Sequence, residues 1–376
     1  MQVITSESVF SGHPDKVCDQ ISDAILDAVL EQDKNARVAV ETAIKDDLVF
    51  VFGEVTTTAK VDYADIAKSK LREIGYEESF KVMEKISKQS ADIALGVDSS
   101  ESHEQGAGDQ GIMFGYACNE TQELMPLPIM LANQISKEMD KARKEQYAHI
   151  FGPDGKCQVS VLYEKGKPKK VQTIVVSAQT KSWIRRELYE DIIINEVLPK
   201  VLDDKTIRES EILINPTGEF VIGGPYADSG LTGRKIIVDT YGGYAKHGGG
   251  AFSGKDVSKV DRSAAYYARF VAKAVVGAVL ATHCEIQLGY VIGIAKPVSV
   301  YVNTFNTGVI SDEKIQDLVN QTFDFRPQHI KKELELDSVK FQELAKYGHF
   351  GREDLDVRWE HVDDKIAELR KLYEKA

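Results

Sequence analysis

The sequence predicts an α+β fold made of three similar domains, each a β-sheet with helices packed on one face. Three times along the chain, a helical pattern is followed by two strand patterns and then by a second helical pattern. A short strand candidate precedes each copy, at 2–5, 111–117 and 235–239. The 376 residues suffice for two or three such domains. Because the copies share a pattern and no visible sequence identity, ordinary alternation of helices and strands is the competing explanation.

The first copy comprises a helix, a hairpin and a second helix, expected at 14–31, 36–44, 48–57 and 62–74. Pro14 suits the first turn of a helix. Apolar residues recur at every fourth position along one face of this helix: Val17, Ile21, Ile25 and Val29. The two strands are rich in Val, Phe and Thr and flank Lys45-Asp46-Asp47, which is typical of a hairpin.

The second and third copies repeat this order. The second has a helix at 126–145, strands at 156–163 and 171–179, and a helix at 185–198. The third has a helix at 261–281, strands at 285–294 and 298–305, and a helix at 311–322. The apolar helix of the third copy contains Arg269 and Lys273, so we expect it to be buried in the core and not to cross a membrane.

Two polar segments that contain Gly, Ser or Asp separate the copies, at 97–111 and 216–233. The first has no hydrophobic periodicity. It is either a surface linker or a mobile lid that closes over a site to exclude water, and composition does not decide between them.

Composition favours a soluble cytoplasmic protein. The formal net charge of −12 argues against a general nucleic-acid binder and against an anionic-membrane binder. Four cysteines lie far apart without a C-x-x-C motif, so the spacing indicates neither a zinc site nor a redox pair. The N-terminus lacks the pattern of a signal peptide.

A glycine-rich stretch that ends in a lysine is the strongest local signal, namely residues 248–255, Gly-Gly-Gly-Ala-Phe-Ser-Gly-Lys. Glycines let backbone N–H groups approach a phosphate, and lysine adds a positive charge. Six Lys or Arg stand against three Asp between Arg234 and Arg262, so this acidic chain has a local basic site. The stretch nearly matches a P-loop, but Asp256 replaces the Ser or Thr, and about twenty loop residues separate the neighbouring strand and helix.

His13 and Asp15 open the first predicted helix. A helix N-terminus attracts anions, and His13 can donate a hydrogen bond or carry a positive charge near neutral pH. Asp15 offers oxygens to a hard cation. Three more aspartates continue at i+4 spacing, namely Asp19, Asp23 and Asp27. They lie away from the apolar face, so we expect a solvated stripe and assign a function only to Asp15.

Two carboxylates occupy the first hairpin. Glu54 ends the row Leu48, Phe50, Phe52, and because both faces of this strand are hydrophobic we expect it to be buried. A buried carboxylate needs a cation or hydrogen-bond donors, and Glu41 of the partner strand supplies a second acid. Exposure at the end of the strand is the alternative for Glu54. Phe220, in a Gly- and Pro-rich loop, is either a core residue or a base-stacking aromatic.

Four segments together carry a resemblance: 12–16 (Gly-His-Pro-Asp-Lys), 106–111 (Gly-Ala-Gly-Asp-Gln-Gly), 230–235 (Gly-Leu-Thr-Gly-Arg-Lys) and 248–256. With them the chain resembles the S-adenosylmethionine synthetase (methionine adenosyltransferase) family over essentially its whole length. The resemblance implies three pseudo-threefold related domains at 1–98, 107–225 and 227–365, with a mobile gate at 97–108. It also implies a homodimer with shared active sites, often paired into a dimer of dimers.

The implied reaction transfers the adenosyl group of ATP to the sulfur of L-methionine, with Mg²⁺ (two ions per site) and K⁺ as cofactors. A thioether needs no general base, so catalysis must stabilise the leaving triphosphate. By resemblance the catalytic residues are His13, Lys156, Arg234 and Lys255. The implied ATP contacts add Asp154, Phe220, Asp228, Lys235 and Ala251. The implied methionine contacts are Glu54, Gln89, Asp109, Asp228 and Lys259. The implied metal ligands are Asp15 and Asp261 for Mg²⁺ and Glu41 for K⁺.

Two other functions compete with this one. An ATPase or kinase of another fold is disfavoured by the long loop and by Asp256. A nucleotide-binding regulatory subunit without activity is disfavoured because the expected metal and leaving-group residues are all present, namely His13, Asp15, Lys156, Lys255 and Asp261. One residue departs from the family pattern: Glu219 stands before Phe220, where a basic residue is common, and we assign it no role.

Overall fold

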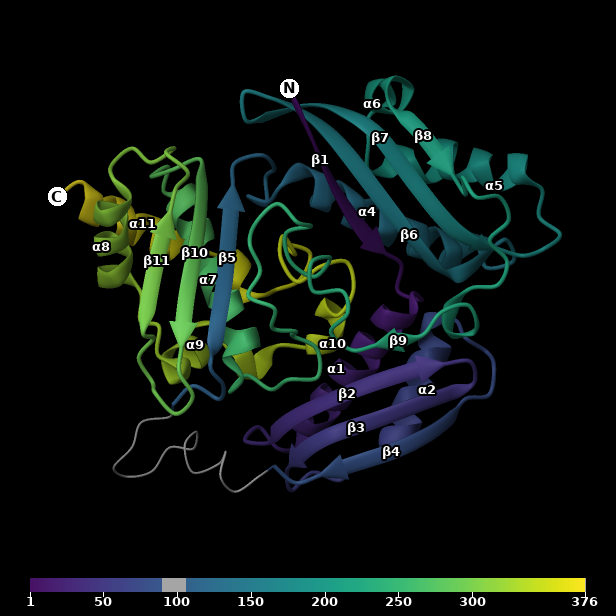
Figure 1. Ribbon diagram of the computed structural model, residues 1–376, viewed down its shortest axis with the longest axis horizontal. Coiled ribbons are helices and arrows are strands. Elements are labelled where there is room, and N and C mark those ends of the chain that lie inside the picture. Colours follow the sequence, from purple (N-terminus) through teal and green to yellow (C-terminus); the bar gives the residue numbers. More distant parts are fainter. Residues whose placement is uncertain (90–105, 376) are drawn as a thin grey trace.

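The computed structural model describes residues 1–89 and 106–375. In this part of the chain the strands form three open sheets on three sides of a central region of loops and helices (Figure 1). The first sheet contains β4 (Lys81–Ser87), β3 (Leu48–Thr56), β2 (Arg37–Lys45) and β9 (Gly230–Leu231). The second contains β1 (Gln2–Val9), β6 (Phe151–Glu164), β7 (Lys167–Thr180) and β8 (Glu211–Ile214). The third contains β11 (Ser299–Asn303), β10 (His283–Tyr290) and β5 (Gly111–Cys118).

Each sheet includes one strand from another part of the chain, and the exchange is cyclic. β1 precedes the first hairpin but pairs with β6 of the second sheet. β5 precedes the second hairpin but pairs with β10 of the third. β9 precedes the third hairpin but pairs with β2 of the first. This regular exchange agrees with the predicted relation between three similar α+β units.

The six predicted helices are present with shifted ends, as α1 (Pro14–Gln32), α2 (Tyr63–Ile74), α4 (Leu127–Ala142), α5 (Arg186–Ile192), α7 (Val260–Gly277) and α8 (Asp312–Thr322). The helices α6 (Asp204–Glu209), α9 (Pro327–Glu333), α10 (Phe341–Leu344) and α11 (Asp363–Tyr373) were not predicted. Single π-helical turns extend α4 and α5, at Arg143–Tyr147 and Ile193–Val197. The 3-10 turns are Leu198–Lys200, Gly224–Tyr226, Leu336–Ser338 and Arg358–Glu360.

The predicted strand at 235–239 is wrong, because these residues form turns. Asp239 N donates to Lys235 O at 2.9 Å, which is a helical spacing and not a strand pairing. The strand of this segment is β9, five residues earlier, where Gly230 pairs with Ile44. An apolar run, Ile236 to Val238, suggested a strand, but only Val238 of the three is buried.

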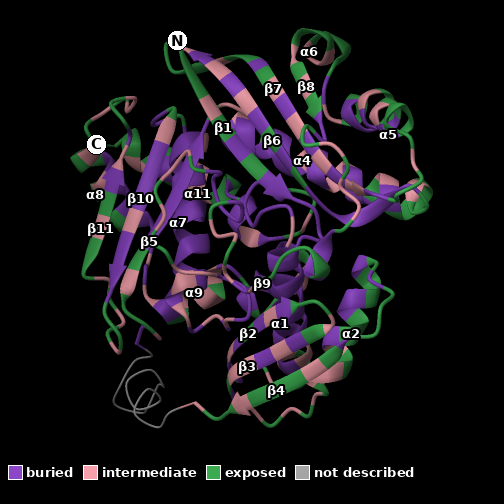
Figure 2. Cartoon of the chain, turned by 45° about the vertical axis from the view of Figure 1, so that its right-hand side comes forward, coloured by how far each residue is buried: buried purple, intermediate pink, exposed green. Residues whose placement is uncertain are grey.

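Two buried helices, α1 and α7, contribute to the larger of the two hydrophobic clusters among the described residues. The side chains of Val17, Ile21, Ile25 and Val29 on α1 have no exposed surface. α7 is also buried along most of its length, as predicted, and its Arg269 and Lys273 meet Glu360 at 3.0 and 2.8 Å (Figure 2). Among the described helices, none combines the length and the apolar character needed to cross a membrane.

Candidate active site

His13 caps the N-terminus of α1 as a neutral ring. Its Nδ1 accepts a hydrogen bond from Asp15 N at 3.2 Å, so the proton resides on Nε2. Burial, followed by the charges of Lys235 and Lys156, lowers the pKa of His13 to about 3. The ring is therefore a hydrogen-bond donor through Nε2 near neutral pH, and the positive charge that the sequence allowed does not develop.

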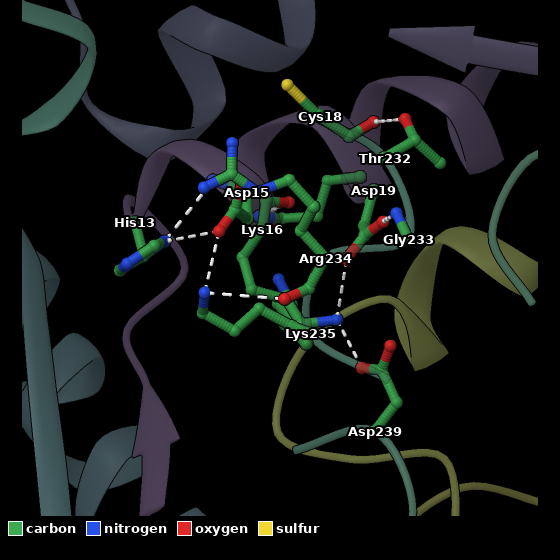
Figure 3. Close-up of polar contacts among 12 residues, drawn as sticks. His13, Asp15, Lys16, Cys18, Asp19, Thr232, Gly233, Arg234, Lys235 and Asp239 are labelled. Carbon is green, nitrogen blue, oxygen red and sulfur yellow. Dashed lines mark hydrogen bonds and ion pairs between the residues drawn. The ribbon is translucent and has the colours of Figure 1, made fainter. Parts of the chain in front are cut away.

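Asp15 is the centre of a group of cations. Its Oδ2 accepts a hydrogen bond from Lys235 Nζ at 2.6 Å, and its Oδ1 accepts one from Leu231 N at 3.0 Å and lies 3.4 Å from Arg234 Nε. Figure 3 shows His13, Arg234 and Lys235 around this carboxylate. Burial alone would raise the pKa of Asp15, but the Lys235 and Leu231 contacts hold it below its usual value. The carboxylate is thus ionised although only 1% of the residue is exposed.

A second group lies at the glycine-rich stretch. Lys255 Nζ contacts Oδ2 of Asp261 at 2.6 Å, and Gly249 N donates to His247 Nδ1 at 2.7 Å. A Cβ atom on Gly250 would lie 2.3 Å from Oδ1 of Asp261, so only glycine lets the backbone pass this carboxylate. The stretch therefore passes close to Asp261, the partner of the lysine at its end.

Asp256, which breaks the P-loop pattern, has a structural role in this chain. Its carboxylate accepts hydrogen bonds from Val38 N at 2.6 Å and from Lys259 Nζ at 2.5 Å. These bonds tie the loop to β2 and leave the residue 2% exposed. The absence of Ser or Thr at this position thus has a physical reason, because the carboxylate anchors the loop.

The expectation of a solvated aspartate stripe on α1 is wrong, because all four residues are buried. Asp19 accepts from Gly233 N, and Asp23 accepts from Gly254 N and pairs with Arg262 through both oxygens at 2.7 Å. Asp27 accepts from Phe341 N and Gln342 N. The stripe turns toward the C-terminal third of the chain and holds its loops against α1.

Helix α1 also separates the two groups. Asp15 contacts the 231–235 loop, whereas Asp23 contacts Gly254 and Arg262 beside Lys255. Eight residues of α-helix correspond to a rise of about 12 Å. Among the described residues, no hydrogen bond or ion pair joins His13 or Asp15 to Lys255 or Asp261.

The two hairpin glutamates lie on the open face of the first sheet. Glu41 pairs with Phe52, and Glu54 follows two residues later on the same face, so the carboxylates are diagonal neighbours. Both glutamates are exposed, and Phe50 and Phe52 are only half-buried. The expected burial of this row does not occur within one chain, because the helices cover the opposite face of the sheet. Gln89 lies two residues after Ser87, the β4 residue that pairs with Glu54, and its backbone N–H donates to Thr56 Oγ1 at 3.2 Å.

The remaining sequence-predicted site residues lie in β6 and in several loops. Lys156 lies in β6 opposite Val9, and its charge acts on His13. Asp154 Oδ2 accepts from Gly224 N at 2.8 Å, and burial raises its pKa to about 6. Phe220 is half-buried, with its carbonyl bonded to Thr180 N. Asp109 and Asp228 are exposed, and Ala251 is half-buried in the glycine-rich stretch.

The predicted gate at 97–108 lies mostly outside the described residues. Its last part is described: Ala107 N donates to Ile294 O at 3.1 Å, and Gly108 N donates to Ser258 O at 3.2 Å. The C-terminal end of the segment is therefore anchored beside Lys259.

Sequence reasoning missed a buried triad beneath Asp15. Lys16 Nζ contacts Asp19 at 2.9 Å and also Asp239, and all three side chains are almost fully buried (Figure 3). Burial raises the pKa of Asp239 to about 7, while Lys16 opposes this shift. A charged pair three residues apart on one helix was visible in the sequence, but the third member is more than two hundred residues away.

Comparison with known proteins covers the chain from end to end. Models of the S-adenosylmethionine synthetase N-terminal, central and C-terminal domains match residues 1–97, 104–220 and 222–361. An S-adenosylmethionine synthase of Prochlorococcus marinus (strain AS9601) is 50% identical over 401 aligned residues, which cover 98% of this chain and 97% of that protein. The S-adenosylmethionine synthase of strain MIT 9515 is 49% identical over 402 residues, with the same coverage.

The chain belongs to the S-adenosylmethionine synthetase family. The family reaction is therefore its reaction: the adenosyl group of ATP is transferred to the sulfur of L-methionine, and the tripolyphosphate is hydrolysed to phosphate and diphosphate. The chain is a methionine adenosyltransferase of one-carbon metabolism. Synthetases of this family require divalent and monovalent metal ions.

Proposed function

We propose that this synthetase carries out adenosyl transfer where the His13 group of one subunit faces the Lys255 group of a second subunit. The single observation that carries this proposal is the division of the predicted site residues between two groups, held two helical turns apart by α1. Both groups combine a carboxylate with lysine, as a metal–polyphosphate complex requires. Neither group by itself contains all the predicted leaving-group contacts.

Adenosyl transfer requires stabilisation of the negative charge that develops on the triphosphate and does not require removal of a proton. The methionine sulfur attacks the ribose 5′ carbon with a free lone pair, and negative charge grows on the triphosphate as the carbon–oxygen bond breaks. We propose that His13 Nε2–H donates toward that oxygen, with Lys156, Arg234, Lys235 and Lys255 on the phosphates. Donors fixed before the reaction stabilise the transition state without reorganisation. The neutral His13 ring, whose Nδ1 is held by Asp15 N, fits this role.

Asp15 and Asp261 fit the predicted magnesium sites. Each is a carboxylate whose partner is the end of a flexible lysine, Lys235 or Lys255. Mg²⁺ binds through one or two carboxylates and phosphate oxygens, so two ions per site would each take one aspartate and release its lysine toward the polyphosphate. When bound, Mg²⁺ neutralises the phosphate charge. Glu41 is an exposed carboxylate on the sheet face, and we assign it to K⁺.

We also assign residues to the two substrates, methionine and ATP. We assign methionine to Glu54, Gln89, Asp109, Asp228 and Lys259. Glu54 is exposed on β3, Gln89 follows β4 of the same sheet, and Asp109 is exposed just before β5. Lys259 is held by Asp256. The adenosine is assigned to Phe220, Asp154, Asp228 and Ala251, with Phe220 stacking on the base.

The open face of the first sheet is our proposed dimer surface. Phe50 and Phe52 stack there with ring centroids 4.9 Å apart, and Leu48 and Met83 beside them are 41% and 56% exposed. A contiguous apolar face next to acidic residues is typical of a protein interface. Pairing two such faces would bury Glu41 and Glu54 against the partner, which is the burial that the sequence predicted. We also propose that two dimers associate and that the enzyme works in the cytoplasm, where its four free cysteines would stay reduced.

The activity is tested by incubating the protein with ATP, L-methionine, Mg²⁺ and K⁺ and by measuring the sulfonium product by mass spectrometry. Product formation that needs both substrates is expected. Consumption of ATP without the product would refute adenosyl transfer, and binding of ATP without turnover would favour a regulatory subunit.

Subunit sharing is tested by mixing two inactive variants, His13→Asn and Lys255→Ala, after reversible dissociation. If each site takes His13 from one subunit and Lys255 from the other, a mixed dimer has one intact site, and random pairing restores about a quarter of the wild-type activity. A mixture that stays inactive, although exchange is shown by differently tagged subunits, would place both groups in one chain's own site.

A further inference from the structure

Three metal-binding side chains of different chemistry meet away from the two catalytic groups. Cys118 is the last residue of β5, Glu120 follows two residues later, and His283 is the first residue of β10. The Cys118 sulfur, a Glu120 carboxylate oxygen and a His283 ring nitrogen all lie within 4.8 Å of one another. The spacing of the cysteines predicted no zinc site, because this group forms only when β5 pairs with β10.

The backbone holds this group rigidly. The antiparallel pairing places His283 directly opposite Cys118 at the end of the ladder, where the two strands lie side by side (Figure 1). Cys118 N donates to Leu124 O at 3.2 Å, and Asn119 N donates to Thr282 O at 3.1 Å. The ligands therefore stand on ordered backbone, which favours metal binding because little ordering is needed when the ion arrives.

Glu120 is oriented by three hydrogen bonds and retains one site for an ion. Leu127 N and Tyr163 Oη donate to its Oε2 at 2.9 and 2.7 Å, and Tyr244 Oη donates to its Oε1 at 2.8 Å. An ionised carboxylate has about four acceptor sites, so about one remains, on Oε1. Outer hydrogen bonds of this kind fix the ligands of protein metal sites.

The other two ligands have the required properties. His283 Nδ1 lies 2.8 Å from Tyr116 Oη, and in the tautomer in which Nδ1–H donates to this hydroxyl, Nε2 keeps its lone pair for a metal. Cys118 has no exposed surface, and its sulfur, which binds a metal as a thiolate, lies within 4.8 Å of the Glu120 carboxylate. A divalent cation would offset both negative charges. Glu120 and His283 are partly exposed, which gives an ion a path from solvent.

We propose that Cys118, Glu120 and His283 bind one thiophilic divalent ion of the zinc class, with water as the fourth ligand. The thiol proton passes to solvent as the sulfur–metal bond forms, without any change of oxidation state. A thiolate, an imidazole and a carboxylate suit Zn²⁺ and exclude Mg²⁺, which prefers oxygen ligands. Bonds of about 2.0 to 2.3 Å require the three side chains to close by about 1 Å. Because Glu120 also binds Tyr163 of β6 and Leu127 of α4, the ion would brace the third sheet against the second.

Cobalt provides the test, because a Co²⁺–thiolate bond gives a near-ultraviolet charge-transfer band that oxygen ligands do not give. The full-length protein is treated with a chelator, supplied with Mg²⁺ to keep the catalytic ligands occupied, and titrated with Co²⁺. We expect the band to saturate at one equivalent and to disappear on addition of Zn²⁺. The variant Cys118→Ser should lose the band. Cys157→Ser is the matched control, because Cys157 is equally buried and only desolvation acts on its thiol.

A second variant covers the case in which Cys118→Ser does not fold. His283→Ala removes a partly exposed side chain and should weaken Co²⁺ binding at least tenfold while the far-ultraviolet dichroism is unchanged. Wild-type protein without the band, or a band that persists in folded Cys118→Ser, would overturn the proposal. Formation of S-adenosylmethionine is measured separately with Mg²⁺, so a failure of the catalytic proposal would leave the cobalt result intact.

Discussion

Lys235 Nζ lies 2.6 Å from Oδ2 of Asp15, so the carboxylate assigned to Mg²⁺ has a lysine side chain as its partner. Asp15 is fixed in the first turn of α1, whereas Lys235 extends from a loop. In the proposed site, this Asp15 oxygen would hold Mg²⁺ and the Lys235 ammonium would bind phosphate. Under that proposal, one ion pair would supply both a metal ligand and a phosphate contact.

Replacing Asp15 by Asn should therefore remove the metal site and leave Lys235 without its partner. We expect S-adenosylmethionine formation to fall by about 10²-fold or more, and the Mg²⁺ concentration needed for half-maximal rate to rise. The measurement is the rate of product formation across a Mg²⁺ titration.

Asp27→Asn is the matched control on the same helix. Asp27 is also buried, but its oxygens accept hydrogen bonds from the backbone N–H groups of Phe341 and Gln342. This variant should lose stability without a shift in Mg²⁺ dependence. Equal shifts in the two variants would contradict a specific role for Asp15.

His13→Asn tests transition-state stabilisation. If the Nε2–H group donates to the departing oxygen, kcat should fall by about 10²- to 10³-fold with a much smaller change in ATP affinity. Rapid-quench rates and equilibrium ATP binding provide the two numbers. Matching losses in both would mean that His13 acts on the ground state.

The pH dependence of stability gives an independent check on the His13 environment. Its pKa is about 3 in the folded chain and near 6.5 when unfolded, so the unfolded state takes up a proton first as the pH falls. The contribution of neutral His13 to the free energy of unfolding is fully present above pH 6.5 and is lost as the pH falls toward 3. At pH 5 this loss amounts to about 2 kcal/mol. Urea unfolding at pH 8 and pH 5 should show this loss in the wild type and its absence in His13→Asn. A loss of the same size in both proteins would show that other groups cause it.

Glu360 should be important for stability and not for chemistry. It pairs with Arg269 at 3.0 Å and with Lys273 at 2.8 Å, and Glu360 and Arg269 are wholly buried. Glu360→Gln would leave buried cations underpaired and should cost about 3 to 5 kcal/mol in the free energy of unfolding. Glu353→Gln is the control, because Glu353 binds the same Lys273 but is 38% exposed. It should cost less than about 1 kcal/mol, and denaturant titration that ranks the two variants the other way would reject this account.

Phe52→Asp tests the proposed dimer surface. A charge in the middle of the open face of the first sheet should shift the protein toward monomers and reduce activity as dissociation proceeds. Light scattering after size-exclusion chromatography, over a range of protein concentrations, measures the assembly state. Trp183→Asp is the control, because Trp183 is 73% exposed but lies in a loop away from this face. An unchanged mass for Phe52→Asp would exclude the face.

The sequence predicted the elements well where one local signal dominated. The 36–44 and 48–57 hairpin and the helix at 14–31 appear as β2, β3 and α1 with ends shifted by a residue or so. The strand at 235–239 was wrong because a short apolar run does not determine pairing, and the available edge of β2 is taken by Gly230. The prediction that the aspartate stripe of α1 is solvated was wrong, because periodicity identifies a helix face but not what covers it. Here, residues more than two hundred positions away cover it.

By itself, the sequence indicated the kind of ligand. The glycine-rich stretch and the cations beside it predict a phosphate site, because backbone N–H groups and lysines suit phosphate oxygens, and the resemblance to the family supplied the reaction. The tertiary structure alone decided which residues lie together. It neutralised His13 by burial beside Lys235 and made Asp256 an anchor for β2. It also brought Cys118 opposite His283. Distances, burial and local fields arise from long-range packing, and no residue spacing along the chain contains them.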